Sequence, residues 1–335
     1  MVDPFCGCGT ALVEALLLGR RSIGSDLNPV AVAVSRAKTK RLAPEQLLLL
    51  SRLEARLPSA MADAMATGDA VLPAGWDPVP GRRFRGLSFW FDEGIAYELA
   101  AVRRVIEAVA DQDVRDVATM CFSSIVVAVS HQDSDTRYVR RAKSVGPGDP
   151  TQLFVRRLRS ARAALDSLAR ETSASAVVHA CDARAIDYLE PRSMQLVVTS
   201  PPYPNAWSYH LYHQNRILWL DEDPWAFKAA EIGHHRDYSA RNGHGAADFE
   251  ADMQATFRSL APALAPGGHV VVVVGDSIVR GEAVRNDRVV AAAAGREGLE
   301  LAAAFDRVID PRRKTFNPSI GKIRREHVLV FDAPR

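Results

Sequence analysis

Gln195-Leu196-Val197-Val198-Thr199-Ser200-Pro201-Pro202-Tyr203 is the segment around which the rest of the chain is organised. The apolar run 195–198 predicts a buried strand, and the two prolines end it because they cannot donate ladder hydrogen bonds. A stiff loop therefore follows the carboxyl end of a strand, which is where ligands bind in open α/β sheets. Such a loop would display Ser200, the Pro201 carbonyl and the Tyr203 ring together. A proline-rich turn with a solvent-facing tyrosine is the alternative.

A second loop lies at the start of the chain, where Asp3-Pro4-Phe5-Cys6-Gly7-Cys8-Gly9-Thr10 precedes an apolar pattern over residues 11–17. The pattern predicts a helix entered through a glycine-rich turn, whose backbone N–H groups can approach a ligand. After a predicted strand around Ile23 comes Asp26. A carboxylate at that place typically accepts hydrogen bonds from both ribose hydroxyls of a nucleoside. Capping of a helix that begins at Pro29 is the alternative role.

Together, D-P-F-x-G-x-G-T and T-S-P-P-Y resemble the motifs of amino-methyltransferases that use S-adenosylmethionine (SAM) to methylate exocyclic nitrogens of DNA bases. The resemblance covers residues 1–40 and 176–335. It implies that Asp182 meets the adenine amino group of SAM. The full set of implied SAM contacts is Asp3, Phe5, Gly7, Gly9, Thr10, Asp26, Leu27, Asp182 and Ala183.

The resemblance implies that residues 199–203 form the catalytic loop, and that its catalytic residues are Ser200, Pro201, Pro202 and Tyr203. Serine at this place is usual for N4-cytosine enzymes, whereas N6-adenine enzymes more often carry Asp or Asn. Oxygen atoms of Ser200 and Pro201 would accept the hydrogens of the target amino group, and Tyr203 would stack on the base or fix the loop. The base would be flipped out of a duplex or come from a single strand.

The alternation of strands and helices favours an α/β fold, and the resemblance implies a doubly wound, mostly parallel seven-stranded sheet that ends in an antiparallel strand pair. Residues 1–41 would begin the catalytic domain, and residues 176–335 would complete it. Residues 42–175 would form a mainly helical insertion and the region that recognises the target. Only Met1 and Val2 precede Asp3, so a missing N-terminal segment or a partner chain is expected to complete the first strand.

The local clustering of basic residues, rather than the net charge of +2, predicts that the chain binds nucleic acid. Residues 131–170 hold nine basic and four acidic residues, and residues 306–325 hold seven basic and two acidic ones. Basic stripes suit a phosphate backbone, although a solvated helix face has the same composition. The residues expected to bind DNA are Arg137, Arg140, Arg141, Trp207, Tyr209, Arg312, Arg313 and Lys314. Of these, Trp207 and Tyr209 would grip an extruded base by stacking.

Three competing functions remain open: methylation of an RNA or tRNA base, an inactive nucleic-acid-binding subunit, and a small-molecule methyltransferase. No metal is expected, because His234, His235, His244 and Asp237 match no zinc spacing. Four scattered cysteines indicate a reducing compartment. No run approaches the ~20 apolar residues of a membrane span, so a cytoplasmic protein is expected.

Overall fold

The computed structural model describes residues 1–68, 70–204, 207–240, 243–308 and 325–333. The strands of its main sheet are β1 (Val2–Asp3), β2 (Ser22–Asp26), β5 (Ala176–Ala180), β6 (Met194–Thr199), β7 (Leu264–Gly275), β10 (Glu300–Val308) and β11 (Arg325–Asp332). Two hairpins lie outside it, formed by β3 (Gln132–Ser134) with β4 (Arg137–Arg140) and by β8 (Ser277–Val279) with β9 (Glu282–Val284).

The helices are α1 (Thr10–Leu17), α2 (Pro29–Lys38), α3 (Pro44–Thr67), α4 (Glu93–Glu107), α5 (Gln112–Val126), α6 (Asp149–Glu171), α7 (Tyr209–Tyr212), α8 (Gln214–Trp219), α9 (Pro224–Ala230), α10 (His235–Ser239), α11 (Ala246–Leu260) and α12 (Asn286–Arg296). Short 3-10 turns occupy Leu87–Phe89, Ala183–Ala185 and Ala261–Ala263. In the part of the chain described, no helix combines the length and apolar content needed to cross a membrane.

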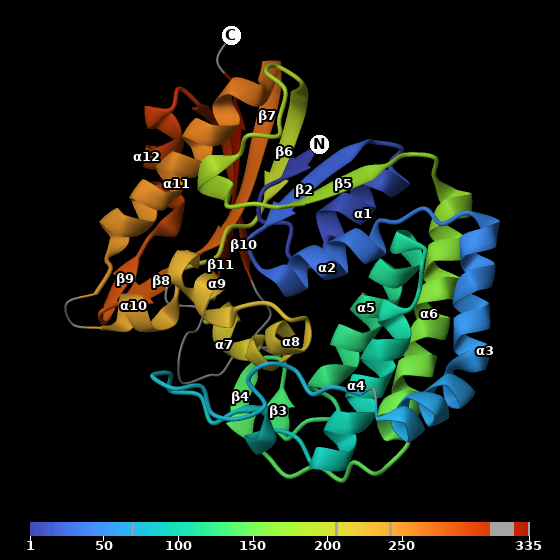
Figure 1. Ribbon diagram of the computed structural model, residues 1–335. Helices are drawn as coiled ribbons and strands as arrows, with labels where there is room; N and C mark the ends of the chain where they lie inside the picture. The colour runs from blue at the N-terminus through green and yellow to red at the C-terminus, as the bar shows by residue number, and fades with distance from the viewer. Residues whose placement is uncertain (69, 205–206, 241–242, 309–324, 334–335) are drawn as a thin grey trace.

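The sheet has the strand order β10-β11-β7-β6-β1-β2-β5 (Figure 1). Strands β5, β2, β1, β6 and β7 run parallel, and β11 pairs antiparallel with both β7 and β10. The predicted fold class, a doubly wound and mostly parallel seven-stranded sheet, is confirmed. Because the order reverses at β1, the loops after β1 and β6 meet at the edge where such sheets bind ligands.

Helices pack on both faces of the sheet. Helices α11 and α12 cover β6, β7 and β11 with a core that includes Phe249, Phe257 and Val290. On the opposite face, α1 and α2 pack against β2 and β5 through Leu12 and Val32. Along β7, the alternate residues Val271 and Val273 remain half exposed. The face of β7 that carries Val271 and Val273 is therefore less buried than the face that packs against α11 and α12.

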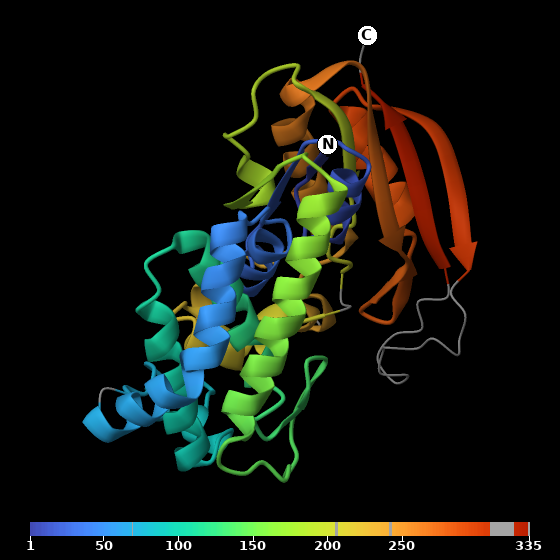
Figure 2. The same ribbon diagram turned by 90° about the vertical axis from the view of Figure 1, so that its right-hand side faces the viewer.

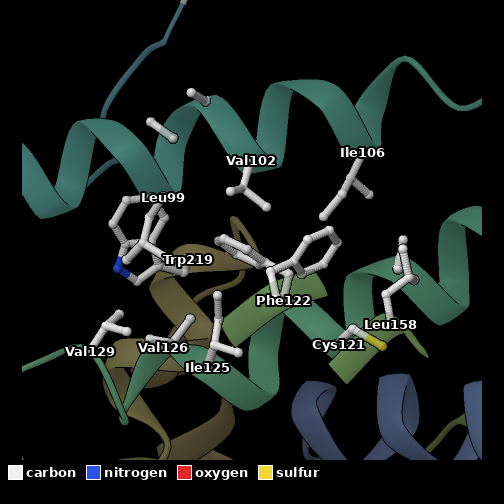
Figure 3. Packing of buried hydrophobic residues seen from close by; sticks show 14 of the residues in the cluster. Leu99, Val102, Ile106, Cys121, Phe122, Ile125, Val126, Val129, Leu158 and Trp219 are labelled. Carbon is white, nitrogen blue, oxygen red and sulfur yellow. The ribbon is translucent and has the colours of Figure 1, made fainter. Parts of the chain in front are cut away.

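A helical body built from α3, α4, α5 and α6 stands beside the sheet (Figure 2). Its core joins Leu99, Val102 and Ile106 of α4 to Phe122 of α5, and Trp219 of α8 inserts among them (Figure 3). Trp219 has no exposed surface. Its burial anchors the segment that follows the Ser-Pro-Pro loop in the helical body.

Two local features depart from what the sequence suggests. The polar stretch 131–143 has the composition of a loop, but it forms the β3–β4 hairpin. Pro266–Gly268 has the composition of a turn, but it lies inside β7, which begins at Leu264. A Cβ atom on Gly268 would lie 3.0 Å from the Met194 carbonyl oxygen, so glycine here allows β7 to pass close to β6.

Candidate active site at the carboxyl edge of the sheet

A cavity of about 360 Å³ lies where the loops after β1, β2, β5 and β6 meet. The predicted site residues that line it are Phe5, Gly7, Asp26, Leu27, Asp182, Ala183, Ser200, Pro202 and Tyr209. The other predicted residues within the described chain do not line it: Asp3, Gly9, Thr10, Pro201, Tyr203, Trp207, Arg137, Arg140 and Arg141. Arg312, Arg313 and Lys314 lie outside the described residues.

The two sequence motifs are joined by a direct hydrogen bond. The Thr199 hydroxyl donates to Oδ1 of Asp3 over 2.7 Å, and the Phe5 backbone N–H reaches the same oxygen over 3.2 Å. Burial raises the pKa of Asp3 to about 7, against the opposing effect of these hydrogen bonds. Asp3 is only 5% exposed, so it positions the loop after β1 against the loop after β6 rather than facing the cavity.

The glycine-rich turn depends on two left-handed residues. Gly7 has φ of +51°, and its N–H donates to Oδ2 of Asp26 over 2.9 Å. Gly9 has φ of +74° and precedes α1 as its N-cap. A Cβ atom on Gly9 would lie 3.0 Å from the Ser35 hydroxyl of α2. Thr10 is the exposed first residue of α1, so it supports the turn from outside the cavity.

The Asp26 carboxylate is held by backbone on both oxygens. Oδ2 accepts the Gly7 N–H and Oδ1 accepts the Asn28 N–H, each over 2.9 Å. Burial raises the pKa of Asp26 to about 6, and the backbone hydrogen bonds limit the rise. The N-cap of α2 is Asn28, whose side chain accepts from the Val30 N–H. The alternative role of Asp26 as the cap of this helix is therefore excluded.

Asp182 lines the cavity, but its carboxylate is already engaged. Arg184 donates to both of its oxygens over 2.6–3.2 Å, and a second branch of the same guanidinium reaches Asp252 over 2.8 Å. These hydrogen bonds outweigh partial burial and hold the pKa of Asp182 below its usual value. Asp182 therefore presents an ionised, rigidly held carboxylate with few remaining acceptor positions.

Ser200 is exposed at the cavity, and its hydroxyl lies 3.3 Å from the Tyr203 hydroxyl. Tyr203 donates in turn to Glu326 of β11 over 3.4 Å, and Glu326 pairs with Arg307. The Tyr203 ring packs against the hydrophobic core that also contains Phe249 and Phe257 of α11. Burial raises the pKa of its hydroxyl to about 12. With its proton directed to Glu326, the Tyr203 oxygen can accept the Ser200 proton, and the Ser200 oxygen then keeps two lone pairs as acceptors.

Several lining residues were missed from the sequence. His213 is held by the Asn28 amide, 2.8 Å from its Nδ1, and burial lowers the pKa of His213 to about 3. Because the Asn28 oxygen is used by α2, its NH₂ donates to Nδ1, and the neutral ring carries its proton on Nε2. Arg216 and Glu231 also line the cavity. None of these residues belongs to a recognisable motif, since their position depends on how α7–α9 fold back over the loop.

The predicted base-gripping residues are neighbours. The rings of Trp207 and Tyr209 lie 6.4 Å apart and nearly parallel, and Trp207 meets Tyr212 edge-on at 5.3 Å. Burial raises the pKa of the Tyr209 hydroxyl above its ordinary value. Tyr209 lines the cavity and Trp207 does not, so only one of the two predicted base-gripping residues borders the enclosed space.

The β3–β4 hairpin carries the three predicted phosphate-binding arginines of the insertion. Arg137 and Arg141 are 62% and 75% exposed and share the Asp133 carboxylate at 3.2 and 3.3 Å. Arg140 donates to the Phe89 carbonyl oxygen over 2.9 Å and lies over the Phe89 ring. All three arginines are therefore exposed to solvent, and two of them share a single carboxylate.

Side-chain contacts tie this hairpin to the cavity wall. Arg216 of α8 pairs with Asp135 over 2.7 Å, and Tyr138 donates to Gln214 over 2.9 Å. In the same interface, Asn215 donates to Gln132 over 3.0 Å. Figure 1 shows β3 and β4 next to α7 and α8 at the carboxyl edge of the sheet. The exposed arginines therefore stand on an element fixed to the residues that line the cavity.

No family model matches the chain. Among solved structures, a proposed DNA modification methylase of Thermus thermophilus, complexed with S-adenosyl-L-methionine, is 22% identical. That alignment covers 46% of this chain and 54% of the other, with a TM-score of 0.29. A SAM-dependent methyltransferase of Methanosarcina mazei is 8% identical and aligns over 99% of this chain and 91% of its own, with a TM-score of 0.37.

In sequence, the chain is 25% identical over 236 residues to the type II methyltransferase M.MvaI of Kocuria varians. The alignment covers 66% of this chain and 50% of the relative. The chain therefore spans about half the length of the curated relative it matches, and over about two thirds of its own length it is similar to a type II methyltransferase.

Proposed function

We propose that this chain transfers a methyl group from SAM to an exocyclic amino group of a DNA base, with N4 of cytosine as the target. The observation that carries the proposal is the Thr199–Asp3 hydrogen bond. It seats the Ser-Pro-Pro loop beside the glycine-rich turn, so that Ser200 and Asp26 line one cavity. The similarity to a type II methyltransferase supports the same class of reaction.

The residues of the cavity fit SAM. Each Asp26 oxygen accepts one backbone N–H and keeps a lone pair, so the carboxylate can accept from two adjacent ribose hydroxyls. Asp182 and Ala183 also line the cavity, and the adenine would lie against them. Bound SAM would supply a methyl group on a positively charged sulfur, and the chain would hold it by Asp26 and the glycine-rich turn.

The affinity for SAM should depend on pH through Asp26. Its carboxylate accepts hydroxyl hydrogen bonds best when ionised, and its pKa is about 6 in the folded chain. Binding should therefore be constant above pH 7 and weaken by up to about tenfold per pH unit below 6. Calorimetry at pH 5 to 8 measures this. The Asp26→Asn variant cannot ionise, so its affinity for SAM should not depend on pH. If this variant keeps the pH profile of the wild type, another group causes the dependence.

The Ser200 loop would activate the amino group. The amino nitrogen of cytosine is a weak nucleophile because its lone pair is delocalised into the ring. Hydrogen-bond acceptors that hold its two hydrogens out of the ring plane direct the lone pair toward the methyl group. The Ser200 oxygen can take this role because its own proton can be donated to Tyr203, which leaves its lone pairs for the amino hydrogens. The amine loses one proton on methylation, and the solvent-exposed side of Ser200 gives that proton a path to water.

The β3–β4 hairpin would bind the phosphate backbone. Replacing Arg137 and Arg141 together by alanine should lower the log–log salt dependence of DNA binding by about 1.8, since each lost phosphate contact contributes about 0.9. The matched control is the double replacement of Arg159 and Arg170 on α6, which pair with Glu54 and Asp166 in the helical body. An equal change of slope in both variants would mean that only total charge matters.

Sequencing of modified bases tests the proposed function in cells. A host that lacks N4-methylcytosine should gain it at a recurring sequence when it expresses the wild-type chain, and should not gain it with Ser200→Ala. N6-methyladenine in its place would overturn the choice of cytosine. Unmodified DNA in cells that contain folded, soluble wild-type chain would contradict the proposal as a whole.

A further inference from the structure

We propose that His210, Glu231 and His234 form a binding site for a divalent transition-metal ion beside the cavity. One ligand atom from each residue lies within 4.8 Å of the other two. All three side chains are buried, with exposed fractions of 9%, 3% and 1%. The proposal concerns a site in the wall of the cavity, to which Glu231 also contributes, and it does not depend on the proposed methyl transfer.

The buried His234 side chain is the main evidence for a bound ion. Neither of its ring nitrogens has a hydrogen-bond partner within the described part of the chain, although the side chain is almost fully buried. A buried polar group without a hydrogen-bond partner requires an explanation, and a bound water or ion is one of them. The Asp237 carboxylate, 3.4 Å from Nδ1, resembles the outer partner that metal-bound imidazoles usually have.

Glu231 and His210 supply the other two ligands. Oε2 of Glu231 lies 2.6 Å from Nδ1 of His210, while Oε1 accepts the Tyr209 N–H at the start of α7. An ion would replace the proton between Oε2 and Nδ1, and the two atoms would move apart to roughly 3.3 Å, as tetrahedral bonds of about 2.0–2.1 Å require. Two imidazoles and one carboxylate suit zinc and its neighbours in the first transition row.

An ion here would hold the cavity wall together. It would join α7 to the segment between α9 and α10, and Glu231 itself lines the cavity. A Cβ atom on Gly233 would lie 3.0 Å from the Tyr203 carbonyl oxygen, so the same segment touches the Ser-Pro-Pro loop. The role we assign to the metal is structural: it fixes Tyr209 and Glu231 relative to that loop.

The test uses the full chain, purified without an affinity tag and stripped with EDTA. Titration with zinc against a chromophoric chelator should give one ion per chain, and Co²⁺ should give the visible absorption bands of a tetrahedral site. His234→Ala should weaken zinc binding by more than about 100-fold, beyond the 10- to 100-fold typical of outer partners. His269→Ala, which removes an exposed histidine paired with Asp332, should bind zinc like the wild type.

Three results would overturn the site. One is a wild-type chain that binds no zinc, a measurement that needs no variant. The second is equal zinc affinity in His234→Ala and the wild type, with circular dichroism confirming that both are folded. The third is loss of zinc only in Asp287→Asn, which would place the ion at the separate cluster of Asp276, Asp287 and His327. If His234→Ala does not fold, His234→Asn and Glu231→Gln serve in its place.

Discussion

Ser200→Ala should lower the rate of methyl transfer by about 100- to 1,000-fold, the usual effect of removing one preorganised hydrogen-bond partner of the reacting group. Its affinity for SAM should stay the same, because the hydroxyl acts on the base and matters most as the amino nitrogen becomes tetrahedral. Single-turnover kinetics and calorimetry on the same preparation measure the two quantities separately.

Two further variants sharpen this prediction. Tyr203→Phe keeps the packed ring but removes the hydroxyl that orients Ser200, so it should lower the rate without reaching the loss seen in Ser200→Ala. Ser193→Ala removes an exposed hydroxyl that donates to the Glu190 carbonyl oxygen before β6, and it should react like the wild type. Full activity in Ser200→Ala and Tyr203→Phe together would mean that the Ser-Pro-Pro loop is only a turn.

Asp26→Ala should weaken SAM binding by about 2–4 kcal/mol, since two hydrogen bonds to a charged group are lost. That range corresponds to an increase in Kd of about 30- to 700-fold. Calorimetry at pH 8, where the carboxylate is ionised, gives the wild-type reference. Asp26→Asn separates charge from shape, because the amide still has one oxygen acceptor but no negative charge, and it should bind with intermediate affinity.

Asp182→Ala provides an internal comparison for the Asp26 prediction. Its carboxylate is already shared with Arg184, so its loss should weaken SAM binding less than the loss of Asp26. A larger effect for Asp182 would place the main cofactor contact at the end of β5 instead of β2. Thermal unfolding of both variants controls for the loss of the Arg184 ion pair, which also reaches Asp252.

The positions of the central residues follow from the sequence because they depend on local rules. Prolines end β6 at Thr199, and parallel strands bring their carboxyl ends to one edge, so the sequence alone places Asp26 and Ser200 together. The Thr199–Asp3 hydrogen bond joins residues 196 positions apart. No local pattern in the sequence indicates this contact.

Other parts of the site depend on distant packing. Glu326 completes the Ser200–Tyr203 arrangement from 123 residues away, and no local pattern marks it. The β3–β4 hairpin is hard to detect because β4 is exposed along most of its length, so its sequence lacks the alternation of buried residues that identifies most strands. His210 lies 24 positions before His234, so the metal-ligand spacing considered for His234, His235 and His244 did not include it.

The most direct test of the central claim is transfer of a labelled methyl group from SAM to duplex DNA by the purified chain, followed by digestion and identification of the modified nucleoside. The account predicts label in N4-methylcytosine with the wild type and a rate reduced at least about 100-fold with Ser200→Ala. Label found only in RNA, or label in DNA at the same rate with Ser200→Ala, would contradict it.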